Sequence, residues 1–353
     1  MTEAGNDSAM KPLALTLGDP AGIGGEIIAR AFLEAPDVMA GCFVVGDLSH
    51  LRRAIAVVAG AGLPVPVLAI EQPAQALDVP PWCIALLQVG QPAPALLPWG
   101  RVQAQAGRMA ADAIDWAAGA ALRGEVAGLV TAPIHKEALA AAGVPYPGHT
   151  ELLAARAAAY LGLPLAQLPV RMMLASDPLR TVLVSIHVSL REAIAAVTQG
   201  NVLQTLRITH TALSRALGRA PRIGVAGLNP HAGEGGLFGR EEIDAIAPAI
   251  TAARAQGIDA SGPHAPDTVF MRARSTPQRP GEFDVVVAMY HDQGLIPVKY
   301  LGLDKGVNVT LGLPLVRTSP DHGTAFDIAG TGRADPASLI AAIRMARQLS
   351  DQR

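Results

Sequence analysis

The 353-residue chain is poor in cysteine, in aromatic residues and in charge. It has only two cysteines, Cys42 and Cys83, with 4% aromatic and 16% charged residues. Two cysteines exclude a disulfide framework and are typical of a protein in a reducing compartment. The formal net charge is −2, so we expect neither a basic field for nucleic acid nor a polybasic membrane patch.

Long apolar runs and the common nucleotide-binding motifs are also missing. No stretch approaches the roughly 20 apolar residues that a membrane-spanning helix needs. The first ten residues, MTEAGNDSAM, lack the basic start and apolar core of a signal peptide. We therefore expect a frayed tail there and a cytoplasmic protein without membrane contact. The absence of a Walker A sequence and of a strict G-x-G-x-x-G argues against a P-loop ATPase and an ordinary Rossmann dehydrogenase.

What is present is an alternation of short apolar runs and Ala-rich helical stretches. Half of the residues are apolar, and the length favours two domains over one core. The alternation predicts an α/β fold with a mostly parallel sheet covered by helices. A helix is expected over 21–33, and strands over 12–17, 42–45, 126–130, 180–186, 222–228 and 283–289. The Pro- and Ala-rich segment 60–98 gives no clear pattern, and 275–281 is expected to be a surface loop.

Three histidines follow predicted strands directly or within two or three residues. His187, His231 and His291 each lie in a polar loop at such a strand end. Ligands of open α/β sheets bind outside the carboxyl ends of the strands, so these imidazoles can converge. Three imidazoles with an open fourth position are typical of a catalytic divalent metal. A single histidine of this kind is more often an ordinary hydrogen-bonded residue, and the hypothesis depends on all three together.

Several other residues are candidates for binding an anion. Lys299, Asn308 and Arg317 lie in a stretch with little other charge, and lysine and arginine suit phosphate or carboxylate. Thr150 precedes an Ala-rich helix and is a candidate N-cap, at a helix start that could also hold an anion. Asp292 could orient the imidazole of His291 or meet a substrate amine.

Several long motifs resemble the 4-hydroxythreonine-4-phosphate dehydrogenase family. They cover the chain from about Leu13 to the C-terminal helix, and the last one also resembles the NAD loop of isopropylmalate and isocitrate dehydrogenases. The motifs are GDPAGIGGE (18–26), TAPIHKEAL (131–139), GHTELL (148–153), GLNPHAGEGG (227–236), APDTVF (265–270), YHDQGLIPVKY (290–300) and NVTLGLPLVRTSPDHGTAFDIAG (308–330). The stretch 154–169 looks longer than the helix and turn usual in the family.

The resemblance implies roles for individual residues. His187, His231 and His291 would bind a divalent metal, with zinc, magnesium and cobalt all open. The substrate would be contacted by His149, Thr150, Lys299, Asn308, Arg317, Asp267 and Asp292. The cofactor, NAD or alternatively NADP, would be contacted by His322, Gly323, Thr324, Ala325, Asp327, Ile328 and Gly330. The catalytic base is left open between Lys299 and a metal-bound hydroxide.

The resemblance also implies the architecture and the reaction. The fold would be isocitrate/isopropylmalate dehydrogenase-like, with two α/β/α domains and a cleft between them. Residues 1–125 and 301–353 would form the NAD-side domain, and 126–300 the metal, substrate and dimerisation domain. A homodimer would carry its site near the interface, where Asp267 and Asp292 could reach the partner's substrate. The reaction would be the NAD-dependent oxidation and decarboxylation of 4-phosphohydroxy-L-threonine to 3-amino-2-oxopropyl phosphate in pyridoxal 5'-phosphate biosynthesis.

Three alternatives stay open. The nearest is a dehydrogenase of the same family that acts on D-threonate or D-erythronate 4-phosphate. A phosphate acyltransferase of related fold would need neither the three histidines nor a cofactor loop with Asp327. A non-catalytic binding protein would be expected to lack some metal or cationic residues, and none is missing.

Overall fold

The computed structural model describes residues 10–302 and 305–350 of the chain. The frayed N-terminal tail expected from the sequence lies outside these residues, apart from Met10. The described chain divides into two compact units. One unit comprises Met1–Arg156 and Gly323–Pro336, and the other comprises Ala157–His322 and Ala337–Arg353.

The residue boundaries of these units differ from those of the two domains expected from the sequence. The chain leaves the first unit after Arg156, within helix α6, whereas the expected boundary follows residue 125. It then returns only for Gly323–Pro336, and the C-terminal helix belongs to the second unit. The roles assigned to the two domains stay a prediction.

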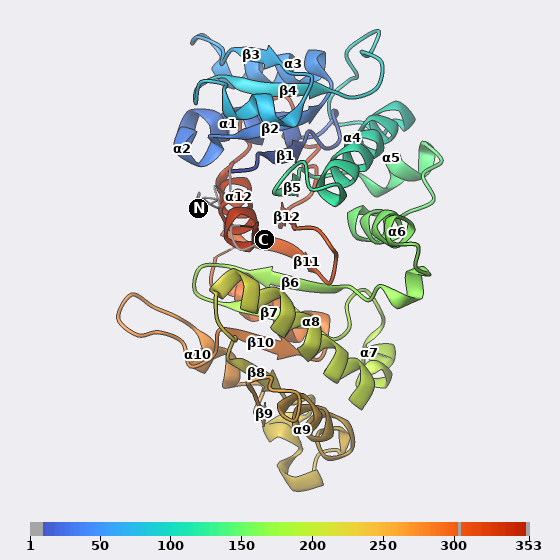
Figure 1. Cartoon of the computed structure of the whole chain (residues 1–353), viewed down its shortest axis with the longest axis vertical. Coiled ribbons are helices and arrows are strands. Elements are labelled where there is room, and N and C mark those ends of the chain that lie inside the picture. The colour runs from blue at the N-terminus through green and yellow to red at the C-terminus, as the bar shows by residue number, and fades with distance from the viewer. Residues whose placement is uncertain (1–9, 303–304, 351–353) are drawn as a thin grey trace, which may run out of the picture. The chain divides into compact units, whose positions relative to one another are not determined.

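The first unit is built on a parallel sheet with the strand order β3-β4-β2-β1-β5. Figure 1 shows these strands in blue and cyan with their helices. The strands are β1 Leu13–Thr16, β2 Cys42–Gly46, β3 Val67–Ala69, β4 Ile84–Gln88 and β5 Gly128–Thr131. The helices are α1 Gly24–Glu34, α2 Pro36–Met39, α3 Leu48–Ala59, η1 Pro73–Leu77, α4 Ala104–Leu122, α5 Lys136–Ala141 and α6 His149–Leu161, which continues into the second unit.

The second unit has a mixed sheet with the strand order β12-β11-β6-β7-β10-β8-β9. The strands are β6 Arg171–Ala175, β7 Arg180–Leu183, β8 Ile223–Ala226, β9 Ala260–His264, β10 Val285–Ala288, β11 Val307–Leu311 and β12 Arg317–Pro320. The helices are η2 Leu165–Gln167, α7 Leu190–Ala196, α8 Gln199–Leu217, η3 Pro230–Gly236, η4 Glu242–Ile246, α9 Ala247–Arg254, α10 Val269–Ala273, α11 His291–Tyr300 and α12 Ala337–Ser350. Strands β7, β10, β8 and β9 pair in parallel, whereas β6, β11 and β12 pair antiparallel.

The expected α/β class with mostly parallel strands is confirmed, and its physical basis is local. Strands β1, β2, β5, β8 and β10 are buried along their whole length, as continuous apolar runs in a helix-covered sheet should be. Each of these strands lies where an apolar run predicts it. The unclear segment 60–98 contains β3, η1 and β4, and 275–281 is a surface loop with one isolated bridge, Thr276 to Arg279.

Within the described residues, no helix is both long enough and apolar enough to span a membrane.

Candidate functional site

Two of the three strand-end histidines lie side by side. His187 comes a few residues after β7, and His291 begins α11 shortly after β10. These strands pair in parallel with Leu183 opposite Ala288. The ladder continues past the strand ends, because the backbone N–H groups of Val184 and Ser185 donate to the carbonyls of Ala288 at 2.9 Å and Met289 at 3.3 Å. The ring centres of His187 and His291 are consequently 5.6 Å apart.

A neighbouring carboxylate orients His291. Its Nδ1 lies 2.7 Å from Asp292 Oδ1, as expected for a proton on Nδ1 that is donated to the carboxylate. The other ring nitrogen, Nε2, is then the one with a lone pair for a ligand. Orienting the imidazole of His291 is one of the two roles that the sequence predicts for Asp292.

His231 lies on a loop with unusual backbone geometry. The η3 segment after β8 has positive φ angles at His231 (53°), Ala232 (53°) and Glu234 (44°). Such angles are costly for residues with a Cβ and persist only where the surroundings hold them. Glu242 holds this loop, because its buried Oε1 accepts hydrogen bonds at 2.7 Å from the backbone N–H groups of Leu228 and Asn229.

The histidines only partly meet the requirements of a metal site. A tetrahedral ion bound by one nitrogen of each of two rings places the ring centres about 5 Å apart, close to the separation of His187 and His291. His231, in contrast, is not placed with these two histidines as a third metal ligand in the described residues. Within residues 10–302 and 305–350, no group of three or more His, Cys, Asp or Glu side chains is arranged to hold a metal. The three-histidine ligand set therefore stays a prediction.

His231 and two predicted substrate residues share a cavity of about 730 Å³ in the second unit. His231, Asp267 and Asp292 all line it, and Tyr290 and Gln293 add polar groups. Three large apolar side chains of its lining are strongly exposed, namely Met271 (71%), Ile296 (63%) and Tyr300 (90%). The cavity thus combines titratable groups with an apolar rim.

The predicted anion-binding residues form a second polar group, joined by a carboxylate. Asp321 lies just after β12, and its side chain is only 8% exposed. Its Oδ2 is 2.7 Å from the Lys299 ammonium, and its Oδ1 accepts a hydrogen bond at 2.8 Å from the Asn308 side-chain amide. Sequence reasoning missed Asp321, although it lies at a strand end within the quoted 308–330 motif.

Arg317 lies beside these residues on the same face of the sheet. Thr318 and Ser319 are opposite Val309 and Asn308 across the β11–β12 pair, so Arg317 comes next to Thr310. The buried Arg317 guanidinium donates to Thr310 Oγ1 at 3.1 Å. The structure therefore brings Lys299, Asn308 and Arg317 to one part of the second unit.

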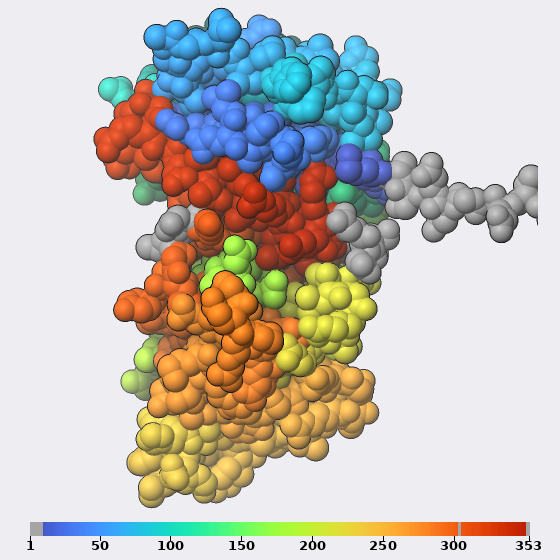
Figure 2. All heavy atoms as spheres, turned by 90° about the vertical axis from the view of Figure 1, so that its left-hand side faces the viewer, coloured from blue at the N-terminus to red at the C-terminus, as the bar shows by residue number. Residues whose placement is uncertain are grey.

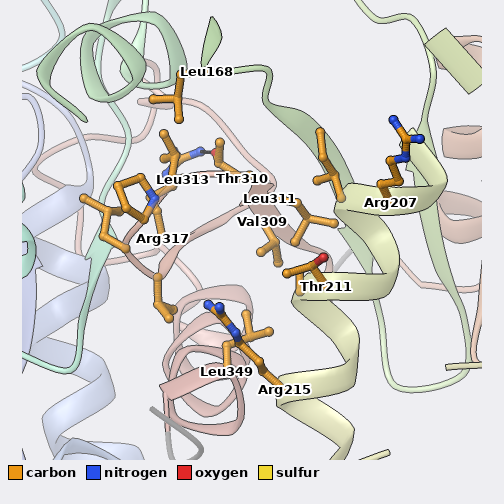
Figure 3. A pocket seen from close by; sticks show the side chains of 16 residues that line it. Leu168, Arg207, Thr211, Arg215, Val309, Thr310, Leu311, Leu313, Arg317 and Leu349 are labelled. Carbon is orange, nitrogen blue, oxygen red and sulfur yellow. Dashed lines mark hydrogen bonds between the residues drawn. The ribbon is translucent and has the colours of Figure 1, made fainter. Parts of the chain in front are cut away.

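A cavity of about 380 Å³ lies beside β11 and β12, and both Thr310 and Arg317 line it. It is lined by Val309 and Leu311, whose side chains alternate with those of Asn308 and Thr310 along the strand. Figure 3 shows Arg207, Thr211 and Arg215 projecting from α8 around this cavity. Of the predicted site residues, Arg317 lines it, whereas Lys299 and the three predicted metal ligands do not.

The predicted cofactor residues from Gly323 to Gly330 lie on a loop of the first unit, whereas His322 belongs to the second. Helix α1 holds this loop through the side chain of Glu26. The buried Glu26 carboxylate accepts hydrogen bonds from the backbone N–H groups of Gly330 at 2.6 Å and Gly332 at 2.7 Å. Asp327 on the same loop is exposed to solvent, as a cofactor contact requires.

Aromatic rings complete the support of this loop. His135 stacks on Phe326 with ring centres 4.8 Å apart and planes nearly parallel. Trp99 packs so closely on Gly330 that a Cβ there would lie 2.5 Å from the indole ring. Arg53 in turn covers Trp99, with its guanidinium carbon 3.7 Å from the ring centre. Sequence reasoning missed these supporting residues, because their partners are far away in the chain.

His149 and Thr150 belong to the first unit and lie in the first turn of α6. The helix begins at His149, so Thr150 is a helical residue and the expected N-cap assignment is wrong. The helix starts two residues earlier than a Thr150 N-cap requires, and the Gly148 carbonyl accepts its first hydrogen bond, from the Leu152 N–H at 3.2 Å. Their proposed contact with the substrate stays a prediction.

Comparison with known proteins defines the family. The model of the family described as pyridoxal phosphate biosynthetic protein PdxA matches residues 38–346. A 4-hydroxythreonine-4-phosphate dehydrogenase of Beijerinckia indica is 55% identical over 340 residues, which cover 96% of this chain and 95% of that protein. A D-threonate 4-phosphate dehydrogenase of Salmonella typhimurium is 46% identical, with 96% of this chain and 99% of that protein covered.

Solved structures agree with the sequence comparison. The crystal structure of a 4-hydroxythreonine-4-phosphate dehydrogenase from Klebsiella pneumoniae is similar with a TM-score of 0.84 and 42% identity. The match covers 99% of this chain and 100% of that one. The chain belongs to the PdxA family.

Proposed function

We propose that this chain is an NAD-dependent dehydrogenase that oxidises 4-phosphohydroxy-L-threonine in pyridoxal 5'-phosphate biosynthesis. The observation that carries the proposal is the cluster of Lys299, Asn308 and Arg317, which suits a phosphorylated acid, in a member of this family. The names of the similar proteins from Beijerinckia indica and Klebsiella pneumoniae support the same activity.

In the proposed reaction, the C3 hydroxyl of the substrate becomes a ketone. The hydride leaves C3 for NAD, and the hydroxyl loses its proton. The resulting β-keto acid loses its carboxylate as carbon dioxide and takes up a proton at C2, which gives 3-amino-2-oxopropyl phosphate. Arg317 and Lys299 bind the phosphate and the carboxylate, which fixes the orientation of the reacting carbon. His149, Thr150, Asp267 and Asp292 provide further substrate contacts.

His187, His231 and His291 are the proposed metal ligands. The close pair His187 and His291 and the orienting contact from Asp292 support this assignment. A divalent ion bound there would lower the pKa of the substrate hydroxyl and stabilise the negative charge that develops on its oxygen. Zinc, magnesium and cobalt are all compatible with the proposal.

The loop residues His322, Gly323, Thr324, Ala325, Asp327, Ile328 and Gly330 are the proposed cofactor contacts. The firm anchoring of this loop by Glu26 supports a binding role, because a preorganised backbone loses little entropy when a ligand binds. We prefer NAD to NADP on the family resemblance. The proposed location is the cytoplasm, which follows from the low cysteine content, and Cys42 and Cys83 are free thiols in the structure.

A homodimer is part of the proposal. Met271, Ile296 and Tyr300 expose apolar surface beside the cavity that contains His231, Asp267 and Asp292. Figure 2 shows the orange part of the chain, which includes α10, over much of the visible face of the second unit. A second copy of the chain would cover this apolar surface and bring Asp267 and Asp292 to its own substrate.

The second candidate is oxidation of D-threonate or D-erythronate 4-phosphate. The 46% identical protein from Salmonella typhimurium carries the D-threonate name, and a similar anion cluster would serve these substrates. The two candidates differ at C2 of the substrate, which carries an ammonium group in one case and a hydroxyl group in the other.

A substrate panel tests the proposal. Purified protein is mixed with NAD, a divalent metal and each of the three phosphorylated acids, and formation of NADH is followed by absorbance, with a chelator as control. We expect metal-dependent reduction that is fastest with 4-phosphohydroxy-L-threonine. Faster turnover of a sugar-acid phosphate would support the second candidate, and no turnover with any of them would refute both.

The variant His231→Ala extends this test to the metal site. We expect it to lose metal-dependent turnover and to bind the metal more weakly in calorimetry, while its circular dichroism spectrum stays unchanged. Near-normal turnover would refute the role of His231.

A further inference from the structure

We propose that Asp321 is a positioning residue that fixes Lys299 and Asn308 as one unit for substrate binding. This inference rests on the proposed function of the site and deepens it, since neither the family resemblance nor the sequence motifs assign a role to Asp321.

The Asp321 carboxylate contacts two different candidate substrate-binding residues, one with each oxygen. Oδ2 pairs with the Lys299 ammonium at 2.7 Å, and Oδ1 accepts from the Asn308 amide at 2.8 Å. The side chain is 8% exposed, whereas Lys299 is 39% exposed. A nearly buried carboxylate with two charge-assisted contacts has little freedom, so it limits the freedom of both partners.

The backbone of Asp321 is itself anchored by a hydrogen bond to Ser338. Its N–H donates to Ser338 Oγ at 3.2 Å, and that hydroxyl donates to the Gly306 carbonyl at 2.6 Å. Ser338 is buried in the first turn of α12. Asp321 is therefore connected to helix α12 and to the chain just before β11, and both belong to the compact second unit.

The contact with Asp321 also fixes the orientation of the Asn308 side-chain amide. Because its amide nitrogen donates to Asp321, its side-chain oxygen points elsewhere. This oxygen is buried and has no hydrogen-bond partner among the described residues. A buried acceptor without a partner is unusual in a protein, and in a binding site it is an acceptor for a donor group of the substrate or for a bound water.

These contacts indicate that Asp321 acts on the substrate through Lys299 and Asn308 and does not bind it directly. Both of its oxygens are occupied by side chains that the substrate is expected to meet, so its effect is indirect. Without the carboxylate, the flexible Lys299 side chain would sample several rotamers and the Asn308 amide could turn over. A displacement of about 1 Å at a positioning contact costs on the order of a hundredfold in rate.

The test is a double-mutant cycle. The variants are Asp321→Asn, Asn308→Ala, Lys299→Met and the two double variants that include Asp321→Asn. The control is Glu71→Gln, the same chemical change at an exposed carboxylate of the first unit. The readouts are kcat/KM for the phosphorylated acid, KM for NAD, and the Kd of inorganic phosphate from calorimetry.

We expect Asp321→Asn to lower kcat/KM by about a hundredfold. The KM for NAD should change by less than about twofold, and the melting temperature should stay close to that of the wild type. In the Asn308→Ala and Lys299→Met backgrounds the same change should cost clearly less than in the wild type, because one of its two partners is already missing and residues that act through one another are not additive. Glu71→Gln should behave like the wild type.

Two outcomes would overturn the inference: an unchanged kcat/KM for Asp321→Asn, or the same loss in the wild type and in both variant backgrounds. If Asp321→Asn does not fold, Asp321→Glu takes its place, since it keeps the charge but moves it by one methylene. If the wild type oxidises none of the acids, the proposed function fails. The cycle is then read on the Kd of inorganic phosphate, where coupling between Asp321 and Lys299 supports the inference and additivity refutes it.

Discussion

Carboxylates orient the polar residues of the second unit. Asp292 contacts His291, Asp321 contacts Lys299 and Asn308, and Glu242 ties down the loop that carries His231. Asp292 is next to its partner in the chain, whereas Asp321 and Glu242 reach partners on other segments of the fold. A functional side chain with a fixed partner occupies fewer conformations, which lowers the entropic cost of binding.

Another carboxylate of the same unit stabilises the fold itself. Burial by itself would raise the pKa of Asp284, but hydrogen bonds from the Arg219 and Arg222 guanidinium groups and from the Arg222 backbone N–H lower it far below its ordinary value. The charged carboxylate is therefore favoured in the folded state. This contribution is complete above the unfolded-state pKa, near the ordinary value of 3.8, and is lost as the pH falls from there through the folded-state pKa.

The variant Asp284→Asn tests this contribution. We expect it to lower the free energy of unfolding at pH 7 by about 1–3 kcal/mol, because the two arginines lose a charged acceptor. The difference from the wild type should shrink at pH 3, where the unfolded wild type binds a proton that the folded protein excludes. Urea unfolding of both proteins at the two pH values measures it, and a difference that is equal at pH 3 and pH 7 would contradict the argument.

At the scale of elements, strand ends and helix starts position the candidate site. The parallel pair β7 and β10 brings His187 and His291 together, and the antiparallel pair β11 and β12 brings Asn308 next to Arg317 and Asp321. In the first unit, α1 provides Glu26 for the loop that follows Gly323. The buried charge of Glu26 has Arg53 in its neighbourhood, and Arg30 donates to the Gly332 carbonyl.

The variant Glu26→Gln tests the link between α1 and the cofactor loop. We expect the Kd for NADH to rise about tenfold or more, because one of two charge-assisted hydrogen bonds to the loop is lost. The Kd for the phosphorylated acid should change little. Fluorescence titration with NADH measures the effect, and Glu71→Gln at an exposed position of the first unit serves as the control. Equal NADH affinity in wild type and Glu26→Gln would show that the loop does not need this anchor.

At the scale of the whole molecule, the apolar surface around the cavity of the second unit is the feature that the single chain leaves unexplained. Met271, Ile296 and Tyr300 are between 63% and 90% exposed and line one cavity. Single exposed apolar residues are common on protein surfaces, but a group beside titratable residues indicates an interface. This is the surface that the proposed homodimer would bury.

The double variant Met271→Asp/Tyr300→Asp tests the interface. We expect the wild type to elute as a dimer in size-exclusion chromatography with light scattering, and the variant to shift to the monomer at the same concentration, because two buried charges would oppose association. Turnover should fall in parallel if the partner completes the site. Leu63→Asp, at a 94% exposed position of the first unit, should leave the dimer intact. A wild type that is monomeric would refute the proposed assembly.

The sequence by itself determined the α/β class and the position of most core strands. It did so because a buried strand needs a continuous apolar run, and that requirement is met locally, as in Leu13–Thr16 and Val285–Ala288. It also indicated which polar residues follow these strands, since His187 and His291 are next to them in the chain. The motifs indicated the family, and the match over residues 38–346 confirms it.

Only the tertiary structure decided which distant segments pair and which side chains meet. The antiparallel pairing of β6 with β11 joins segments more than 100 residues apart, and no local pattern encodes it. The contact of Glu26 with Gly330 spans 304 residues of the chain, and the contact of Asp321 with Lys299 joins a strand end to a helix. The left-handed loop at His231 is held by Glu242, so its shape depends on packing rather than on its glycines alone. Local patterns encode secondary structure because its hydrogen bonds and burial are local, whereas a binding site is formed by long-range contacts that only the folded chain makes.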